Sequence, residues 1–218
     1  MKMLKHRLLI MATALLIASP SVAKKKKKAP KKAAPAAEKI ELLPVGAKAP
    51  HFTLKPINRG SIGVGLGDPT ANRFGATVLK KLVGKKRKPS DVKLVVLSFY
   101  ATWCKSCQKE VPYLNELTKE LAPKGLRSFV IAVDKGGDGK KLLDAKLAEG
   151  MGPKKTKIEI PIFHDGFNIL QKKFKAAALP TVYMINAEGK IVFTKHGFNE
   201  KKGDKKKLRA AVLKGLGS

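Results

Sequence analysis

The sequence predicts an α/β domain in which helices pack on a β-sheet, and two adjacent patterns carry this prediction. Residues 95–100 form an apolar run of β-branched and aromatic side chains, which is typical of a buried strand. Beyond it, apolar residues recur every three or four positions, which predicts an amphipathic helix packed on the sheet: Val111, Leu114, Leu117 and Leu121. Pro112 lies within this helix and is expected to kink it.

The remaining elements follow from the same kinds of pattern. A short lead-in strand is expected within residues 45–54, and a helix over 71–83. Further strands are expected at 126–133, 182–185 and 191–195, and further helices at 140–149, around 167–174 and at 204–216. Two glycine-rich stretches, 60–69 and 134–139, are expected to be a flexible turn or hairpin tip and a plain turn.

The chain has only two cysteines, Cys104 and Cys107, where the buried strand passes into the helix. Cys104 is expected at or just before the helix N-terminus, where unpaired N–H groups and the helix dipole stabilise a thiolate. The two-residue spacing puts both sulfurs on nearly the same helix face, so a small disulfide can close and reopen. The pair indicates a redox device, with a small structural disulfide or half of an intermolecular metal site as alternatives. A scaffold disulfide between distant segments and a four-cysteine zinc site are excluded within one chain.

Charge is the second unusual property of the sequence. Lys and Arg number 46 against 16 Asp and Glu, which gives a formal net charge of +30. Such a surface favours solubility and weak attraction to anionic lipid, cell-wall polymer or nucleic acid. No zinc-ligand pairs, stacking motif or recognition-helix pattern accompanies it, so no specific nucleic-acid partner is expected.

The first 44 residues predict targeting and linker segments ahead of a domain at 45–218. A basic start, an apolar stretch at 8–18 and small residues at Ser21 and Ala23 are typical of a secretory signal, predicted over 1–23. The protein is therefore expected outside the cytoplasm, in the periplasm, or anchored at the membrane if the signal is not cleaved. Residues 24–44 are rich in Lys, Ala and Pro and predict a disordered linker with, at most, weak contact to an anionic membrane or wall.

Several motifs together resemble a known fold and family. Trp103-Cys104-Lys105-Ser106-Cys107 after a hydrophobic strand, and Leu179-Pro180-Thr181 before a later strand, resemble the thioredoxin fold. This resemblance implies an α/β domain with a central mixed β-sheet flanked by helices. Within that fold, the segment 99–104 followed by Glu110-Val111-Pro112 is similar to the TlpA/ResA-like extracytoplasmic thiol-disulfide oxidoreductases. The resemblance covers roughly residues 45–200, and it departs at 55–91, where this chain has an insert before the strand 95–100.

The resemblance implies a protein disulfide reductase that maintains redox homeostasis of exported proteins. Its expected substrates are protein disulfides, such as those of apocytochrome c during cytochrome c maturation, and its expected electron donor is a membrane protein. It implies no cofactor and no metal beyond the redox-active pair Cys104/Cys107. Whether the chain reduces or oxidises its substrates is not set by the sequence, because potentials within this fold run from about −270 to about −120 mV.

The resemblance also implies roles for individual residues. Cys104 forms a mixed disulfide with the substrate, and Cys107 resolves it. Many thioredoxins carry a buried aspartate six residues before the first cysteine, where this chain has Ser98. The resemblance points instead to Glu110 as the carboxylate that takes the proton of Cys107, with a solvated Glu110 as the alternative. Three further residues are implied in substrate binding, with Pro180 expected to be cis: Trp103, Leu179 and Pro180.

Two other functions remain open, and a third is disfavoured. One is a copper- or metal-handling binding protein that uses the two cysteines and a histidine such as His164. Another is a redox-inert docking module tethered by the basic tail. A peroxidase is disfavoured, because the positions of its threonine and proline are Ala101 and Leu97 here.

Overall fold

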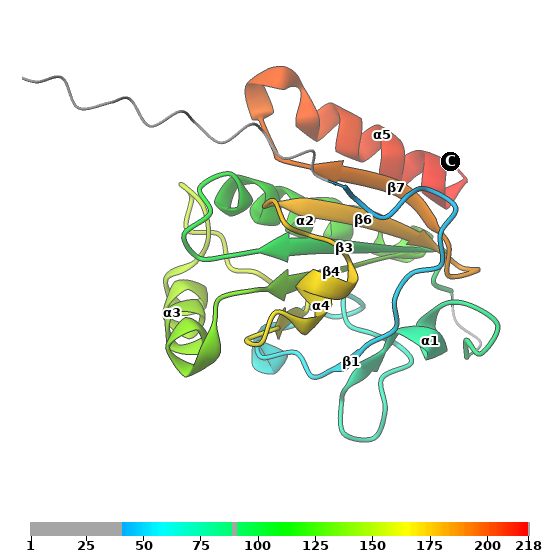
Figure 1. Cartoon of the computed structure of the whole chain (residues 1–218), viewed down its shortest axis with the longest axis horizontal. Helices are drawn as coiled ribbons and strands as arrows, with labels where there is room; N and C mark the ends of the chain where they lie inside the picture. Colours follow the sequence, from blue (N-terminus) through cyan, green and yellow to red (C-terminus); the bar gives the residue numbers. More distant parts are fainter. Residues whose placement is uncertain (1–40, 89–90, 218) are drawn as a thin grey trace, which may run out of the picture. The chain divides into compact units, whose positions relative to one another are not determined.

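The computed structural model describes residues 41–88 and 91–217, and these build an α/β fold around one mixed five-stranded sheet (Figure 1). The strand order is β5-β4-β3-β6-β7. β3 pairs in parallel with β4 and antiparallel with β6, which in turn pairs antiparallel with β7. The five strands are β3 (Leu94–Tyr100), β4 (Leu126–Ala132), β5 (Ile162–His164), β6 (Thr181–Asn186) and β7 (Ile191–His196). The predicted central mixed sheet flanked by helices is thus confirmed.

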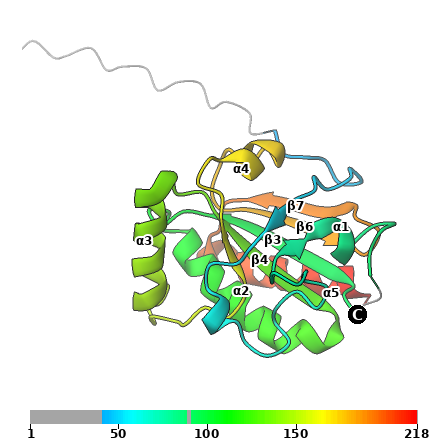
Figure 2. The same cartoon turned by 90° about the horizontal axis from the view of Figure 1, so that it is seen from below.

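Helices cover both faces of this sheet. Figure 2 shows α2 and α5 on one side and α4 on the other, with α3 beside the ends of the strands. α2 begins at Cys107, seven residues after the last residue of β3. Cys104 therefore lies in the connection between β3 and α2, and Cys107 is the first residue of the helix. The helices are α1 (Leu79–Leu82), α2 (Cys107–Leu121), α3 (Gly136–Glu149), α4 (Ile169–Lys173) and α5 (Asp204–Leu216), with short 3-10 turns η1 (Arg59–Ser61), η2 (Ala122–Lys124) and η3 (Glu200–Lys202).

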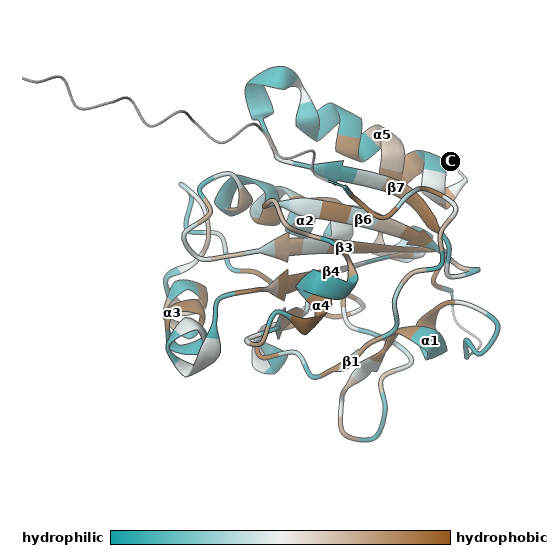
Figure 3. Cartoon of the chain, in the orientation of Figure 1, coloured by the Kyte–Doolittle hydropathy of each residue, from teal (hydrophilic) through white to brown (hydrophobic). Residues whose placement is uncertain are grey.

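β3 lies at the centre of the sheet, and every one of its seven residues is buried. A strand covered on both faces has a continuous apolar sequence rather than an alternating one. This explains why β3 gives the strongest strand signal in the sequence. Figure 3 shows the same distribution, with hydrophobic residues on the central strands and hydrophilic ones on the outer sides of the helices.

Two predicted elements differ from the observed ones. The helix expected over 71–83 is wrong except for α1, because β2 (Thr77–Val78) pairs with β1 (Thr53–Leu54) and takes the middle of that segment. Phe74, which lies in the part of this segment that is not helical, is 54% exposed. α3 begins at Gly136, so most of the stretch expected to be a plain turn is helical. β1 is the only strand within the expected lead-in region of the described chain.

The insert at 55–91 is fastened to the sheet by the side chain of Asn58. Its amide nitrogen donates to the carbonyl of Ile160 at 2.9 Å, and its oxygen accepts from the N–H of Ile162 at 2.9 Å. Further along, the N–H of Gly63 donates to the carbonyl of Glu159 at 3.0 Å. The glycine-rich stretch, expected to be a flexible tip, is therefore tied to the segment that enters β5.

The predicted signal segment 1–23 lies outside the described residues, as does the predicted linker up to residue 40. Among the helices that the structure describes, none has the length and apolar character needed to cross a membrane.

Candidate redox site

Cys104 and Cys107 are joined by a disulfide at the amino end of α2, with their Cα atoms 5.3 Å apart. Cys104 is 6% exposed, whereas Cys107 is completely buried. Access therefore differs between the two sulfurs, and a substrate thiol or disulfide meets Cys104 first.

Two groups at the start of α2 lie within hydrogen-bond distance of the Cys104 sulfur. The backbone N–H of Cys107 points at Cys104 Sγ, with the nitrogen 3.2 Å from the sulfur. The hydroxyl of Ser106 lies 3.5 Å from the same sulfur. N–H groups at a helix start have no partner within the helix and favour a negative charge in front of them. When the disulfide is reduced, this arrangement stabilises Cys104 as a thiolate.

Asp134 anchors the turn that carries the cysteines. Its carboxylate accepts hydrogen bonds from the Thr102 hydroxyl at 2.6 Å and from the Thr102 N–H at 3.1 Å. The side chain of Gln108 donates to the carbonyl of Thr102 at 2.7 Å. Asp134 follows β4, which is parallel to β3, so both strands end at the same edge of the sheet. Sequence reasoning missed this residue, because the spacing between Thr102 and Asp134 carries no motif.

Glu110 is buried, with 1% of its surface exposed, and lies one helical turn after Cys107 on the same face of α2. Its Oε1 accepts a hydrogen bond from the Ser98 hydroxyl at 2.5 Å. Burial raises the pKa of the Glu110 carboxyl from 4.5 to about 7, against the lowering effects of the Ser98 hydrogen bond and the Lys195 charge. The carboxyl can therefore gain or lose a proton near neutral pH.

The residues expected to bind substrate lie at the same edge of the sheet. Trp103 is 71% exposed, next to Cys104. The Leu179–Pro180 peptide bond is cis, as expected from the resemblance. β6 runs antiparallel to β3 with Thr181 opposite Phe99, so the residues that precede β6 meet those that follow β3.

Side chains that could ligate a metal ion do not gather in the described part of the chain. In residues 41–88 and 91–217, no group of three or more His, Cys, Asp or Glu side chains could hold a metal ion. His164, the histidine named for a copper site, has its Nε2 2.7 Å from the backbone oxygen of Asp134.

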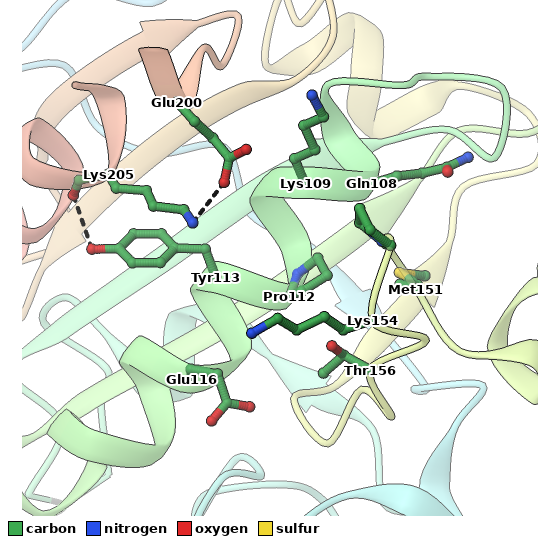
Figure 4. Close-up of a pocket in the computed structure, with 12 residues that line it drawn as sticks. Gln108, Lys109, Pro112, Tyr113, Glu116, Met151, Lys154, Thr156, Glu200 and Lys205 are labelled. Atoms are coloured by element: carbon green, nitrogen blue, oxygen red, sulfur yellow. Dashed lines mark hydrogen bonds and ion pairs between the residues drawn. The ribbon is translucent and has the colours of Figure 1, made fainter. Parts of the chain in front are cut away.

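A groove of about 560 Å³ runs along the outer side of α2 (Figure 4). The groove is lined by α2, by the segment 151–156 and by residues at the start of α5. Neither cysteine lines it. Figure 4 shows the Tyr113 hydroxyl, which donates a hydrogen bond to the backbone carbonyl of Lys205. The ammonium group of Lys205 forms an ion pair with Glu200. The lining residues are Gln108, Lys109, Pro112, Tyr113, Glu116, Met151, Gly152, Pro153, Lys154, Thr156, Glu200 and Lys205.

A mixed sheet whose central strand leads into a helix-terminal Cys-x-x-Cys disulfide defines a thioredoxin-fold protein. The family model of the AhpC/TSA family matches residues 45–194, and the chain belongs to this family. The chain is also similar to proteins named thiol-disulfide oxidoreductase ResA, which confirms the resemblance seen in the sequence.

Two of these relatives show how far the likeness extends. ResA from a strain of Bacillus cereus is 32% identical over 117 residues, which is 53% of this chain and 62% of that protein. ResA of Geobacillus thermodenitrificans is 33% identical over 130 residues, 57% of this chain and 70% of that protein. The chain thus spans somewhat less than two thirds of the first of these relatives.

Solved structures show the same fold at lower sequence identity. A crystal structure described as a putative thiol:disulfide interchange protein DsbE from Chlorobium tepidum matches with a TM-score of 0.58 and 23% identity. The match covers 80% of this chain and 99% of that one. At this identity the likeness concerns the fold.

Proposed function

We propose that the protein is a thiol-disulfide oxidoreductase that reduces disulfides of other proteins through Cys104 and Cys107. The observation that carries the proposal is the pair itself: a disulfide at a helix start, with the more accessible sulfur facing the N–H of Cys107. The ResA names of the relatives support the same activity.

The proposed reaction begins with the reduced pair. The Cys104 thiolate attacks one sulfur of a substrate disulfide, forming a mixed disulfide while the other substrate sulfur leaves as a thiolate. Cys107 then gives its proton to the Glu110 carboxylate and attacks Cys104 Sγ. The second substrate sulfur leaves, so the substrate gains two electrons and the Cys104–Cys107 disulfide forms. A dithiol donor must reduce this disulfide before the next cycle.

Neighbouring residues serve this reaction in distinct ways. We infer that Trp103 forms the rim that the substrate meets, since it is highly exposed beside Cys104. Leu179 and Pro180 would present backbone to an extended substrate segment at the same sheet edge. Asp134 and Gln108 hold the turn in place through Thr102.

The setting of the reaction is proposed from the sequence and the relatives. A secretory signal at 1–23 would place the domain outside the cytoplasm, in the periplasm or at its membrane. Exported proteins such as apocytochrome c would then be the substrates, and a membrane protein would supply electrons. The Lys-rich linker 24–44 would add weak contact with an anionic membrane or wall.

Trapping variants test the exchange directly. The Cys107→Ser variant, incubated with a disulfide-containing protein such as insulin, should accumulate a mixed disulfide through Cys104 that a thiol reductant releases. The Cys104→Ser variant is the matched control and should trap far less, because Cys107 is buried. Equal trapping by both variants, or by neither while the folded state is retained, would contradict the proposal.

A further inference from the structure

A row of residues crosses the sheet beneath Glu110. Ser98 in β3 stands opposite Val182 in β6, and Val182 stands opposite Lys195 in β7. Residues paired in this way point to the same face of a sheet. Ser98 contacts Glu110 of α2, so Lys195 rises from the same face, two strands away, or about 10 Å across the sheet.

Lys195 is held in this position by several acceptors. Its ammonium donates to Asp204 Oδ2 at 2.8 Å, at the first residue of α5, and to the carbonyl of Gly197 at 2.7 Å. Asp204 also accepts from the N–H of Asn199 at 2.8 Å. Only 23% of the Lys195 side chain and 8% of the Asp204 side chain are exposed, so this ion pair is shielded from solvent much better than a surface pair.

The same lysine is linked through Gly197 to the edge of the sheet where Pro180 lies. Gly197, whose carbonyl it binds, donates its N–H to the carbonyl of Pro180 at 2.7 Å. Lys195 therefore connects three parts of the site: the start of α5, the segment after β7 and the cis-proline segment.

We propose that the Lys195–Asp204 ion pair, which lies on the same face of the sheet as Ser98 and Glu110, sets the charge state of the Glu110 carboxyl that accepts a proton from Cys107. The proposal rests on the proposed function for the role of Glu110 in resolution. The partners act in opposite directions, because the Lys195 charge favours the Glu110 carboxylate and the Asp204 charge disfavours it.

Few other charged or titratable groups of the described chain bear on Glu110. The sheet contributes Ser98, which is not titratable, and Lys195, while α5 contributes Asp204 together with Lys207, whose ammonium lies 3.8 Å from Asp204 Oδ1. On α2 itself, Cys107 becomes a titratable thiol once the pair is reduced, and Cys104 lies beside it. In the oxidised protein, Lys195 and Asp204 are therefore the charged groups of the described chain that act most on Glu110.

The test is a titration of Glu110 in the oxidised protein, where neither cysteine titrates. The carboxyl carbon is followed by ¹³C NMR and assigned with the Glu110→Gln variant. Lys195→Met should move the midpoint to higher pH, and Asp204→Asn should move it to lower pH. Lys195→Arg should keep the midpoint of the Glu110 titration close to that of the unsubstituted protein. Lys206 is an exposed lysine of α5, so Lys206→Met should leave the midpoint unchanged.

Opposite shifts distinguish this role from a structural one. Both substitutions break the same ion pair, so a purely structural role would move the midpoint in one direction for both, or not at all, and either result would overturn the proposal. If Lys195→Met does not fold, Asp204→Asn and Lys195→Gln supply the same comparison.

A rate measurement separates the effect of the ion pair on Glu110 from the role of Glu110 in resolution. The rate at which each folded variant resolves a mixed disulfide is measured against pH. If the Glu110 midpoints shift in opposite directions and the rate profiles follow them, both proposals hold. If the midpoints shift but the profiles do not, the ion pair controls Glu110 and the role of Glu110 in resolution is wrong.

Discussion

Among the single residues of the site, Glu110 supplies a buried carboxyl group on the helix that carries Cys107. Ser98 lies in β3 six residues before Cys104, and Glu110 of α2 accepts a hydrogen bond from its hydroxyl. This buried carboxyl therefore comes from α2, one helical turn after Cys107. Its burial keeps a proton on it at pH values where an exposed glutamate is ionised.

Glu110→Gln should slow resolution and remove one step of its pH dependence. With the pKa of Glu110 near 7, the carboxylate fraction, and so the rate, rises as the pH passes through neutrality. Gln cannot accept the proton, so we expect a loss of about 100-fold above neutral pH, leaving only the rise from thiol ionisation. Rapid-mixing measurements of mixed-disulfide breakdown on either side of pH 7 check this. Identical profiles for the two proteins would remove Glu110 from the mechanism.

The same substitution should change stability in a pH-dependent way. The folded protein holds the Glu110 proton more tightly than the unfolded chain, so this contribution to stability is complete below pH 4.5 and is lost as the pH rises through about 7. Gln never ionises, so the oxidised Glu110→Gln protein should gain up to about 3 kcal/mol over the unsubstituted protein at alkaline pH. Urea unfolding at acidic and alkaline pH measures the difference, and a gap that does not change with pH would contradict the assignment.

At the scale of elements, α3 shows how packing overrides local sequence preference. Gly136, Gly137 and Gly139 lie in its first turn, where low helix propensity suggested a turn. A Cβ at Gly139 would lie 2.5 Å from the backbone carbon of Asp134, so the helix approaches this residue as only glycine allows. α3 thereby packs directly against the residue that anchors Thr102.

Two glycine substitutions in α3 should have opposite effects. Gly139→Ala should destabilise the protein by about 1–3 kcal/mol, because α3 or Asp134 must move, and exchange by the cysteines should slow with it. A Cβ at Gly137 meets nothing within 4 Å, so Gly137→Ala should stabilise the helix by about 0.5 kcal/mol. Thermal or urea unfolding of both variants tests this. A loss of stability in Gly137→Ala as large as in Gly139→Ala would show that close packing is not the cause.

The elements also show what sequence patterns can predict. α5 begins and ends at the residues predicted for it, and β3 was recognisable because it is buried on both faces. The prediction of a helix over 71–83 was wrong outside Leu79–Leu82, because Thr77–Val78 pairs with β1, more than 20 residues earlier in the chain. Within the site, the cysteine pair is predicted from its spacing at the end of a strand, and Glu110 from the family resemblance of the segment that follows the pair. The roles of Asp134 and of the Lys195–Asp204 pair could not be predicted from the sequence, because their contacts join segments that no motif or periodic pattern relates.

At the scale of the whole molecule, the charge of +30 should govern encounters with partners. Long-range attraction speeds association with acidic proteins and is screened as the Debye length falls from about 10 Å at 0.1 M salt to about 3 Å at 1 M. We therefore expect reduction of an acidic protein substrate to slow several-fold with added salt. Reduction of a small uncharged disulfide should hardly change. Equal salt dependence for both substrates would show that the charge does not steer them.

Cys104 and Cys107 should behave as a reversible redox couple, and a redox titration measures this. The domain is equilibrated with thiol redox buffers, and the fluorescence of Trp103, the single tryptophan of the chain, reports the state of the adjacent pair. We expect one reversible two-electron transition, with a potential towards the lower end of the range from about −270 to about −120 mV for a reductase, and its absence in Cys104→Ser. A disulfide that shows no reversible transition while the protein stays folded would contradict the account.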